Sequence, residues 1–119
     1  MLTCPTHVPI YFFARPVDLR KSFDGLCGLV QSALGRTVTD GHLFLFVNKR
    51  QDRLKAIWWE PGGLVIWYKR LEQGTLELPR VGSEQSHVTL DVAQLAMLLA
   101  GVPLDPSRRR KRMSLAGTV

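Results

Sequence analysis

The sequence contains only two cysteines, Cys4 and Cys27, and three histidines that are far apart from one another. No CxxC, HxH or HExxH pair is present, so the spacing supports neither a zinc site nor a disulfide framework. A glycine-rich phosphate loop and a GxSxG nucleophile turn are also missing. We therefore expect a protein that binds rather than catalyses, without a cofactor.

Long apolar runs are absent as well. No segment approaches the ~18 apolar residues that a membrane-spanning helix needs, and residues 1–14 lack the basic start and apolar stretch of a signal peptide. We expect a cytoplasmic protein with no membrane partner. A length of 119 residues suits one hydrophobic core, and we assign residues 1–105 to a single domain.

The excess of positive charge is concentrated at the C-terminus. The chain has 16 basic and 10 acidic residues and a net charge of +6, and five of the basic residues are consecutive: Arg108, Arg109, Arg110, Lys111 and Arg112. We expect residues 106–119 to form a basic, disordered tail. Such a run either serves as a solvated tail or binds polyanions with a strong dependence on salt.

The hydrophobic pattern predicts strands and helices along residues 9–101. A strand is expected over 9–14, followed by a helix that starts near Pro16, carries apolar residues from Leu19 to Leu34 and ends at Gly35. Further strands are expected over 42–47, 54–60 and 64–70, with weaker ones at 76–78 and 87–90. Asp91 and Gln94 form the capping box of a second, short helix.

These elements predict an α+β fold, in which an antiparallel β-meander sheet packs against an N-terminal amphipathic helix and a short C-terminal helix. We expect both helices to cover one face of the sheet, which leaves the other face free for a ligand.

Aromatic and basic residues are interleaved in the middle of the chain. Residues 49–70 contain six basic and two acidic residues, together with Trp58, Trp59 and Trp67. Packing within the sheet is the ordinary role of a strand tryptophan. Side chains alternate along a strand, however, so Trp58 and Trp59 cannot both point to one side. At least one of them needs another layer, a partner or a ligand such as a nucleic-acid base.

Several ordered segments resemble the TnpB accessory proteins of IS66-type bacterial insertion sequences, which are encoded by the second open reading frame. The segments are residues 15–26, 42–46, 52–55, 58–59 and 67–72, and the resemblance covers roughly residues 8–103. The turn Glu60-Pro61-Gly62-Gly63 departs from the family pattern. The resemblance implies a role in DNA transposition beside a separate, larger transposase and another accessory protein, and it brings no catalytic residues.

Three hypotheses follow. The first is a DNA-binding or assembly accessory, compatible with a homo-oligomer, whose contacts to insertion-sequence DNA come from one set of residues: Arg20, Lys21, Lys49, Arg50, Arg53, Lys55, Trp59, Tyr68, Lys69, Arg70 and the tail Arg108–Arg112. The second is a protein adaptor that docks to the transposase through the helix face around Phe23 and an exposed tryptophan. The third is a small metal-dependent nuclease that uses Asp18, Asp24 or Asp52.

Overall fold

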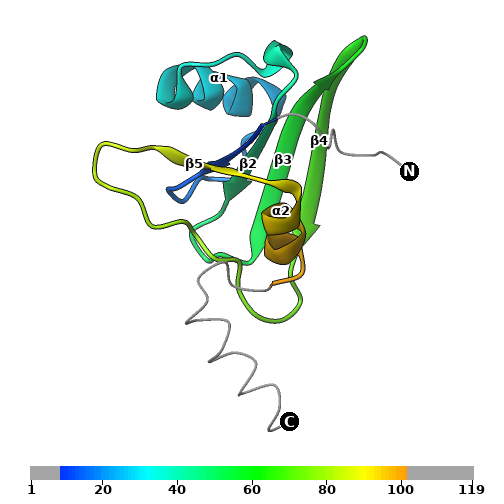
Figure 1. The fold of residues 1–119 in the computed structure, drawn as a ribbon. Helices are drawn as coiled ribbons and strands as arrows, with labels where there is room; N and C mark the ends of the chain where they lie inside the picture. The colour runs from blue at the N-terminus through cyan, green and yellow to red at the C-terminus, as the bar shows by residue number, and fades with distance from the viewer. Residues whose placement is uncertain (1–8, 102–119) are drawn as a thin grey trace, which may run out of the picture.

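Five strands form one mixed sheet in the order β4-β3-β2-β1-β5. The structure is a computed structural model that describes residues 9–101. Its elements in chain order are β1 (Ile10–Phe13), α1 (Phe23–Leu34), the short 3-10 helix η1 (Val38–Asp40), β2 (Leu43–Val47), β3 (Arg53–Glu60), β4 (Gly63–Arg70), β5 (His87–Leu90) and α2 (Val92–Leu99). Figure 1 shows β3 and β4 as the longest strands, at one side of the sheet.

The predicted α+β class is confirmed, but the prediction of a purely antiparallel meander is wrong. Strands β2, β3 and β4 do form an antiparallel meander. In contrast, β1 is parallel to β2, with Ile10 opposite Leu43, and β5 adds antiparallel to the other side of β1. Parallel neighbours need a long crossover connection, and α1 lies in that connection. The hydrophobic pattern of each strand carries no information about this pairing.

Apolar side chains are buried on both faces of the sheet. One core contains Ile10, Phe12, Trp58 and the α2 residues Leu95 and Leu98. The other contains Tyr11, Phe44, Ile57 and the α1 residues Leu26 and Val30. The two helices therefore cover opposite faces, and the expectation of one covered face is wrong. All five residues of β2 are buried, as expected for a central strand of a three-layer structure.

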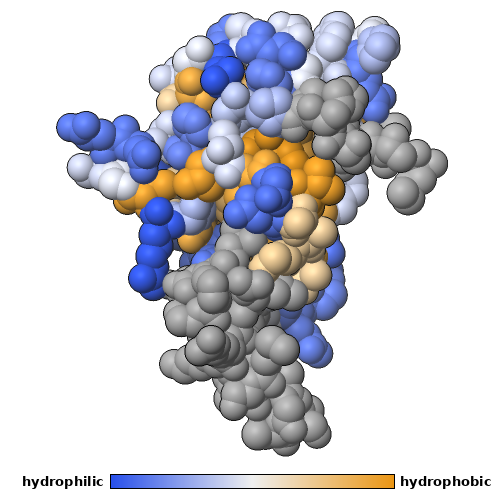
Figure 2. Space-filling view, in the orientation of Figure 1, coloured by the Kyte–Doolittle hydropathy of each residue, from blue (hydrophilic) through white to orange (hydrophobic). Residues whose placement is uncertain are grey.

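The outer surface follows this layering. In Figure 2, hydrophobic side chains are visible in the middle of the face that carries α2, and hydrophilic ones gather on the side of α1. Among residues 9–101, no helix is long and apolar enough to cross a membrane.

The first helix begins later than predicted. Pro16 to Lys21 are not helical, and α1 starts after Ser22. Two contacts hold this segment in another conformation: the Val17 N–H donates to the Val47 carbonyl at 2.9 Å, and Asp18 Oδ1 accepts from the Arg20 N–H at 3.0 Å. An aspartate that bonds the backbone two residues on competes with helix formation. The predicted end is confirmed, since Gly35 has a left-handed φ of 64°.

The second helix has the predicted start. The Asp91 side chain accepts from the Gln94 N–H, and Gln94 accepts from the Asp91 N–H in return. Strand β5 also lies at the predicted residues. The weak strand expected at 76–78 does not form. Leu76 is instead a buried part of the core on the α2 side, and its N–H donates to the Gln51 carbonyl.

Candidate nucleic-acid interface

A groove with a volume of about 770 Å³ is lined by residues from three stretches of the chain, within 16–20, within 48–55 and at Tyr68. One wall is the segment before α1, a second is the loop between β2 and β3, and the floor is formed by β3 and β4. Five basic and two acidic residues line this basic groove, among twelve lining residues: Pro16, Val17, Asp18, Leu19, Arg20, Asn48, Lys49, Arg50, Asp52, Arg53, Lys55 and Tyr68.

The segment before α1, which forms one wall of the groove, is anchored because every second side chain is buried. Val17 and Leu19 are buried in the core on the α1 side, while Asp18 and Arg20 are exposed. The Arg20 guanidinium donates to both Asp18 carboxylate oxygens, at distances from 2.7 to 3.1 Å. These hydrogen bonds, and then the one from the Arg20 backbone, lower the pKa of Asp18 to about 2. Asp18 therefore stays ionised at neutral pH and orients Arg20 beside the groove.

The loop between β2 and β3 is closed by Asn48. Its Oδ1 accepts from the N–H groups of Asp52 and Arg53 at 3.0 and 2.9 Å. Its Nδ2 donates to Asp52 Oδ1 at 2.6 Å. Lys49 and Arg50 lie at the exposed tip of this loop, and neither forms a salt bridge within residues 9–101. The loop thus presents two cations whose charges are not neutralised by a neighbouring carboxylate in the described region.

The floor of the groove joins two cations to an aromatic ring. Arg53 donates to the Tyr68 hydroxyl at 3.1 Å, which raises the pKa of Arg53. The Lys55 ammonium donates to the Lys21 carbonyl at 2.8 Å and lies 4.9 Å from the centre of the Tyr68 ring, within the range of a cation–π contact. Tyr68 is 49% exposed. The floor therefore offers positive charge and an accessible ring side by side.

The structure brings together six of the residues predicted to bind DNA: Arg20, Lys49, Arg50, Arg53, Lys55 and Tyr68. Lys21 borders this set through its carbonyl. Arg70 is paired with Arg53 across β3 and β4, but its guanidinium forms a salt bridge with Glu72 at 2.9 Å.

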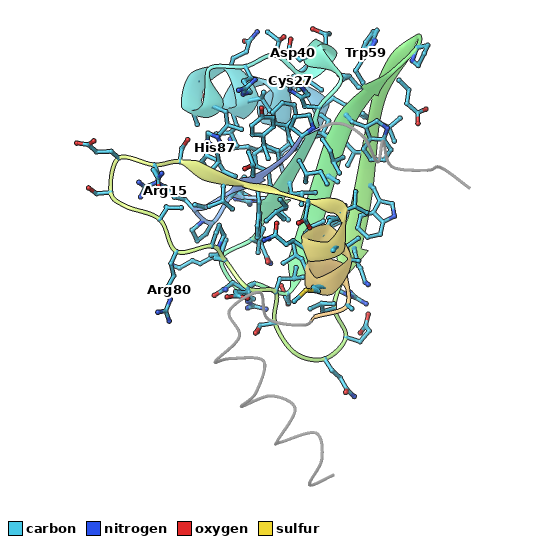
Figure 3. All side chains as sticks on the ribbon, viewed as in Figure 1. Arg15, Cys27, Asp40, Trp59, Arg80 and His87 are labelled. Carbon is cyan, nitrogen blue, oxygen red and sulfur yellow. The ribbon has the colours of Figure 1, made fainter. Side chains whose placement is uncertain are left out.

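Two predicted residues lie away from the basic groove. Lys69 follows Tyr68 in β4 and so points to the opposite face, where its ammonium donates to the Leu99 carbonyl at the end of α2, at 2.8 Å. Trp59 lies at the turn end of β3 and is 39% exposed, whereas Trp58 is buried at 2%. Figure 3 shows Trp59 near the tip of the β3–β4 hairpin, on the side of η1. The tail, Arg108 to Arg112, lies outside the described residues.

Two of the three carboxylates named for a nuclease have other partners nearby. Asp18 is bound to Arg20 and Asp52 to Asn48, while Asp24 lies in the exposed first turn of α1. In the part of the chain that the structure describes, no three His, Cys, Asp or Glu residues are grouped to hold a metal ion.

Sequence reasoning gave no role to Asn48, although an asparagine before a charged turn is a recognisable signal for a closed loop. A helix starting near Pro16 would have placed Asp18 in its first turn, whereas in the structure Asp18 precedes α1 and orients Arg20.

Comparison with known proteins gives one family and two relatives. Residues 8–109 match the family model described as "IS66 Orf2 like protein". The chain is 36% identical to "Uncharacterized protein y4jC" of Sinorhizobium fredii (strain NBRC 101917 / NGR234) over 82% of this chain and 80% of that protein. It is 31% identical to "Uncharacterized protein y4hO" of the same strain, over 86% of this chain and 87% of the other. No solved structure matches the chain.

Proposed function

Because the chain belongs to the IS66 Orf2-like family, we propose that it is a non-catalytic accessory protein of insertion-sequence transposition that binds DNA through the basic groove. Membership of this family associates the chain with insertion sequences. Direct contact with DNA, and cooperation with the element's transposase and its other accessory protein, are the further steps of the proposal.

The composition of the groove is the observation that supports DNA binding. The segment before α1, the loop after β2 and two strands converge there with five basic residues against two acidic ones. Asp18 and Arg20 neutralise each other, which leaves four basic residues and one acidic residue, Asp52, whose carboxylate accepts a hydrogen bond from Asn48. A concave surface with one sign of excess charge concentrates ligands of the opposite sign. Backbone phosphates are such ligands, and they dominate the affinity of DNA-binding proteins.

The residues have different roles in this proposal. Lys49 and Arg50, at the exposed loop tip, contact phosphates. Arg53 and Lys55 are held by the Tyr68 hydroxyl and the Lys21 carbonyl, so they add charge at fixed positions. Tyr68 is half-exposed between them and can stack on an unpaired base. The run from Arg108 to Arg112 acts as an electrostatic tether, and its deletion weakens binding without abolishing it.

The experiment measures binding of the full chain to insertion-sequence end DNA by fluorescence anisotropy at several salt concentrations. The double variant Lys49→Gln/Arg50→Gln is compared with Lys69→Gln, which removes one charge from the opposite face of the same sheet. Each phosphate contact contributes about 0.9 to the slope of log affinity against log salt concentration. The double variant therefore lowers this slope by about 1.8, while Lys69→Gln leaves it unchanged.

Two results contradict the proposal. One is that the wild-type chain has no affinity for DNA at low salt. The other is that the double variant and Lys69→Gln have the same slope, because the contacts would then come from elsewhere on the chain.

Exposed apolar residues favour a second candidate function, a protein adaptor that docks to the transposase. Phe23 at the start of α1 is 43% exposed and Trp59 is 39% exposed. Large side chains of this kind often anchor protein interfaces. Co-purification of the chain with the transposase after nuclease treatment, and its loss in Phe23→Ser, would support the adaptor. A complex that disappears on nuclease digestion would support DNA binding instead.

A further inference from the structure

Strand β4 forms an edge of the sheet along its whole length. It has eight residues, Gly63–Arg70, and each of them is paired with one residue of β3 without a bulge. Within residues 9–101, no strand pairs with its outer side. Figure 1 shows β4 as the outermost strand of the long hairpin. An edge of this kind presents a row of backbone N–H and C=O groups that can pair with another strand.

The side chains of β4 carry apolar surface to this edge on both faces. Val65 and Trp67 pack against the core on the α2 side, and Leu64 and Ile66 pack against the core on the α1 side. All four are half-buried. Proteins that keep a sheet edge unpaired usually place a proline, a bulge or an inward-pointing charge in it, and residues 64–67 have none of these. Both cores therefore extend to an edge that favours continuation of the sheet.

The charges at the two ends of the β3–β4 hairpin have opposite signs. Glu60 is paired with Gly63 at the turn end. Lys69 is at the other end of β4, beside Arg70, whose charge is already paired with Glu72. If a second copy pairs its β4 antiparallel to this one, the acidic end of each copy meets the basic end of the other. A parallel arrangement would instead place basic residues against basic residues. The pattern of acidic end, apolar centre and basic end is thus complementary to itself in the antiparallel direction only.

We propose that the protein forms a homodimer in which two copies of β4 pair antiparallel about a two-fold axis near Ile66, so that the two sheets become one. This register places Lys69 of one copy opposite Gly63 of the other. Glycine has no side chain there, and the space a Cβ would occupy has no atom within 4 Å. Glu60 lies one strand beyond Gly63, on the same face as Lys69, so its backbone is two strand spacings, roughly 9.6 Å, from that of Lys69. The glycine leaves a path toward the carboxylate. The Lys69 ammonium donates to the Leu99 carbonyl of its own chain, so it must exchange that contact to pair with Glu60 of the other copy.

The dimer has a consequence for the basic groove. A two-fold axis perpendicular to the sheet keeps corresponding faces on the same side. The side chains of Arg53, Lys55 and Tyr68 from both copies therefore lie on one face of the joined sheet, and the two grooves are presented together. The dimer itself is argued from the edge of β4 and does not depend on DNA binding.

The first experiment measures the molar mass of the full chain by light scattering after nuclease treatment and in high salt. The wild type is expected at twice the chain mass of 13.4 kDa. Val65→Lys places a charge in the middle of the edge, and a monomer is expected. Val92→Lys is the matched control, because Val92 is 43% exposed on α2, and it is expected to remain a dimer. Circular dichroism establishes that both variants are folded.

The second experiment tests the register with conservative changes. In a background where Cys4 and Cys27 are replaced by serine, Ile66→Cys is expected to form an intermolecular disulfide on mild oxidation, because the two copies of position 66 meet at the axis. Val92→Cys is expected to give no such product.

Three results would overturn the proposal. The first is a wild-type chain that is monomeric at all concentrations, which excludes the dimer. Slow amide exchange along β4 in that monomer would mean that another segment of the same chain covers the edge. A dimer that persists in Val65→Lys and is not cross-linked at position 66 uses a different surface. A monomer that still binds DNA with the expected salt dependence leaves the basic groove supported and refutes only the dimer.

Discussion

The substitution Asn48→Ala tests how the loop of the basic groove is held. Alanine removes two accepted hydrogen bonds, from the N–H groups of Asp52 and Arg53, and one donated to the Asp52 carboxylate. A typical intramolecular hydrogen bond contributes about 0.5–1.5 kcal/mol net. Asn48 and Asp52 are only half-buried, so water replaces part of what is lost. We expect a decrease of about 2 kcal/mol in the free energy of unfolding.

Urea unfolding followed by tryptophan fluorescence measures this decrease as a lower midpoint with an unchanged slope. Gln73→Ala is the matched control, because Gln73 is exposed in the segment after β4, and its effect should lie within about 0.5 kcal/mol. If Asn48→Ala and Gln73→Ala have the same midpoint, backbone contacts alone hold the loop and the role given to Asn48 is refuted.

Measuring DNA binding by Asn48→Ala distinguishes the effect of the position of the loop from the effect of its charge. The variant keeps Lys49 and Arg50, so the dependence of affinity on salt should stay close to that of the wild type. The affinity itself should fall at every salt concentration, because the two cations must be ordered on binding. A variant that changes the salt slope but not the affinity at low salt would contradict this reasoning.

Three further predictions concern the rest of the fold. Asp91→Ala removes the capping box of α2 and should cost about 1 kcal/mol in thermal or urea unfolding, while Asp91→Ser should restore most of the loss. Leu98→Ala empties a position that is 1% exposed and should cost about 2–5 kcal/mol, against less than about 0.5 kcal/mol for the exposed Val92→Ala. Burial, and then the charge of Arg36, lower the pKa of His87 from 6.5. As the pH falls, the unfolded chain therefore binds a proton at this residue before the folded chain does. The stabilising contribution of neutral His87 should be complete above pH 6.5 and decrease as the pH falls through the lower folded-state pKa. This part of the pH dependence should be missing in His87→Gln, and an unchanged profile in that variant would assign it to another group.

The sequence by itself determined the elements whose signals are local. The apolar segments between residue 42 and residue 70, separated by a polar loop and a Pro-Gly-Gly turn, mark the β2–β3–β4 meander. Asp91 with Gln94 marks the start of α2. A strand pattern and a capping box each depend on residues a few positions apart. The basic character of the loop at 48–53 is local too, so Lys49, Arg50, Arg53 and Lys55 were recognisable as candidates.

Only the tertiary structure decided which of these parts meet. The parallel pairing of β1 with β2 and the placement of α1 and α2 on opposite faces depend on contacts between distant residues, which an element's own pattern does not specify. The alternation of side chains along β4 predicts that Tyr68 and Lys69 point to opposite faces of the sheet. The packing of the helices decided that Tyr68 lies in the groove and that Lys69 reaches the end of α2. Burial of Val17 and Leu19 brings Arg20 to a loop some thirty residues later in the chain. The groove exists because hydrophobic burial is not directional and acts between any apolar surfaces that the chain can bring together.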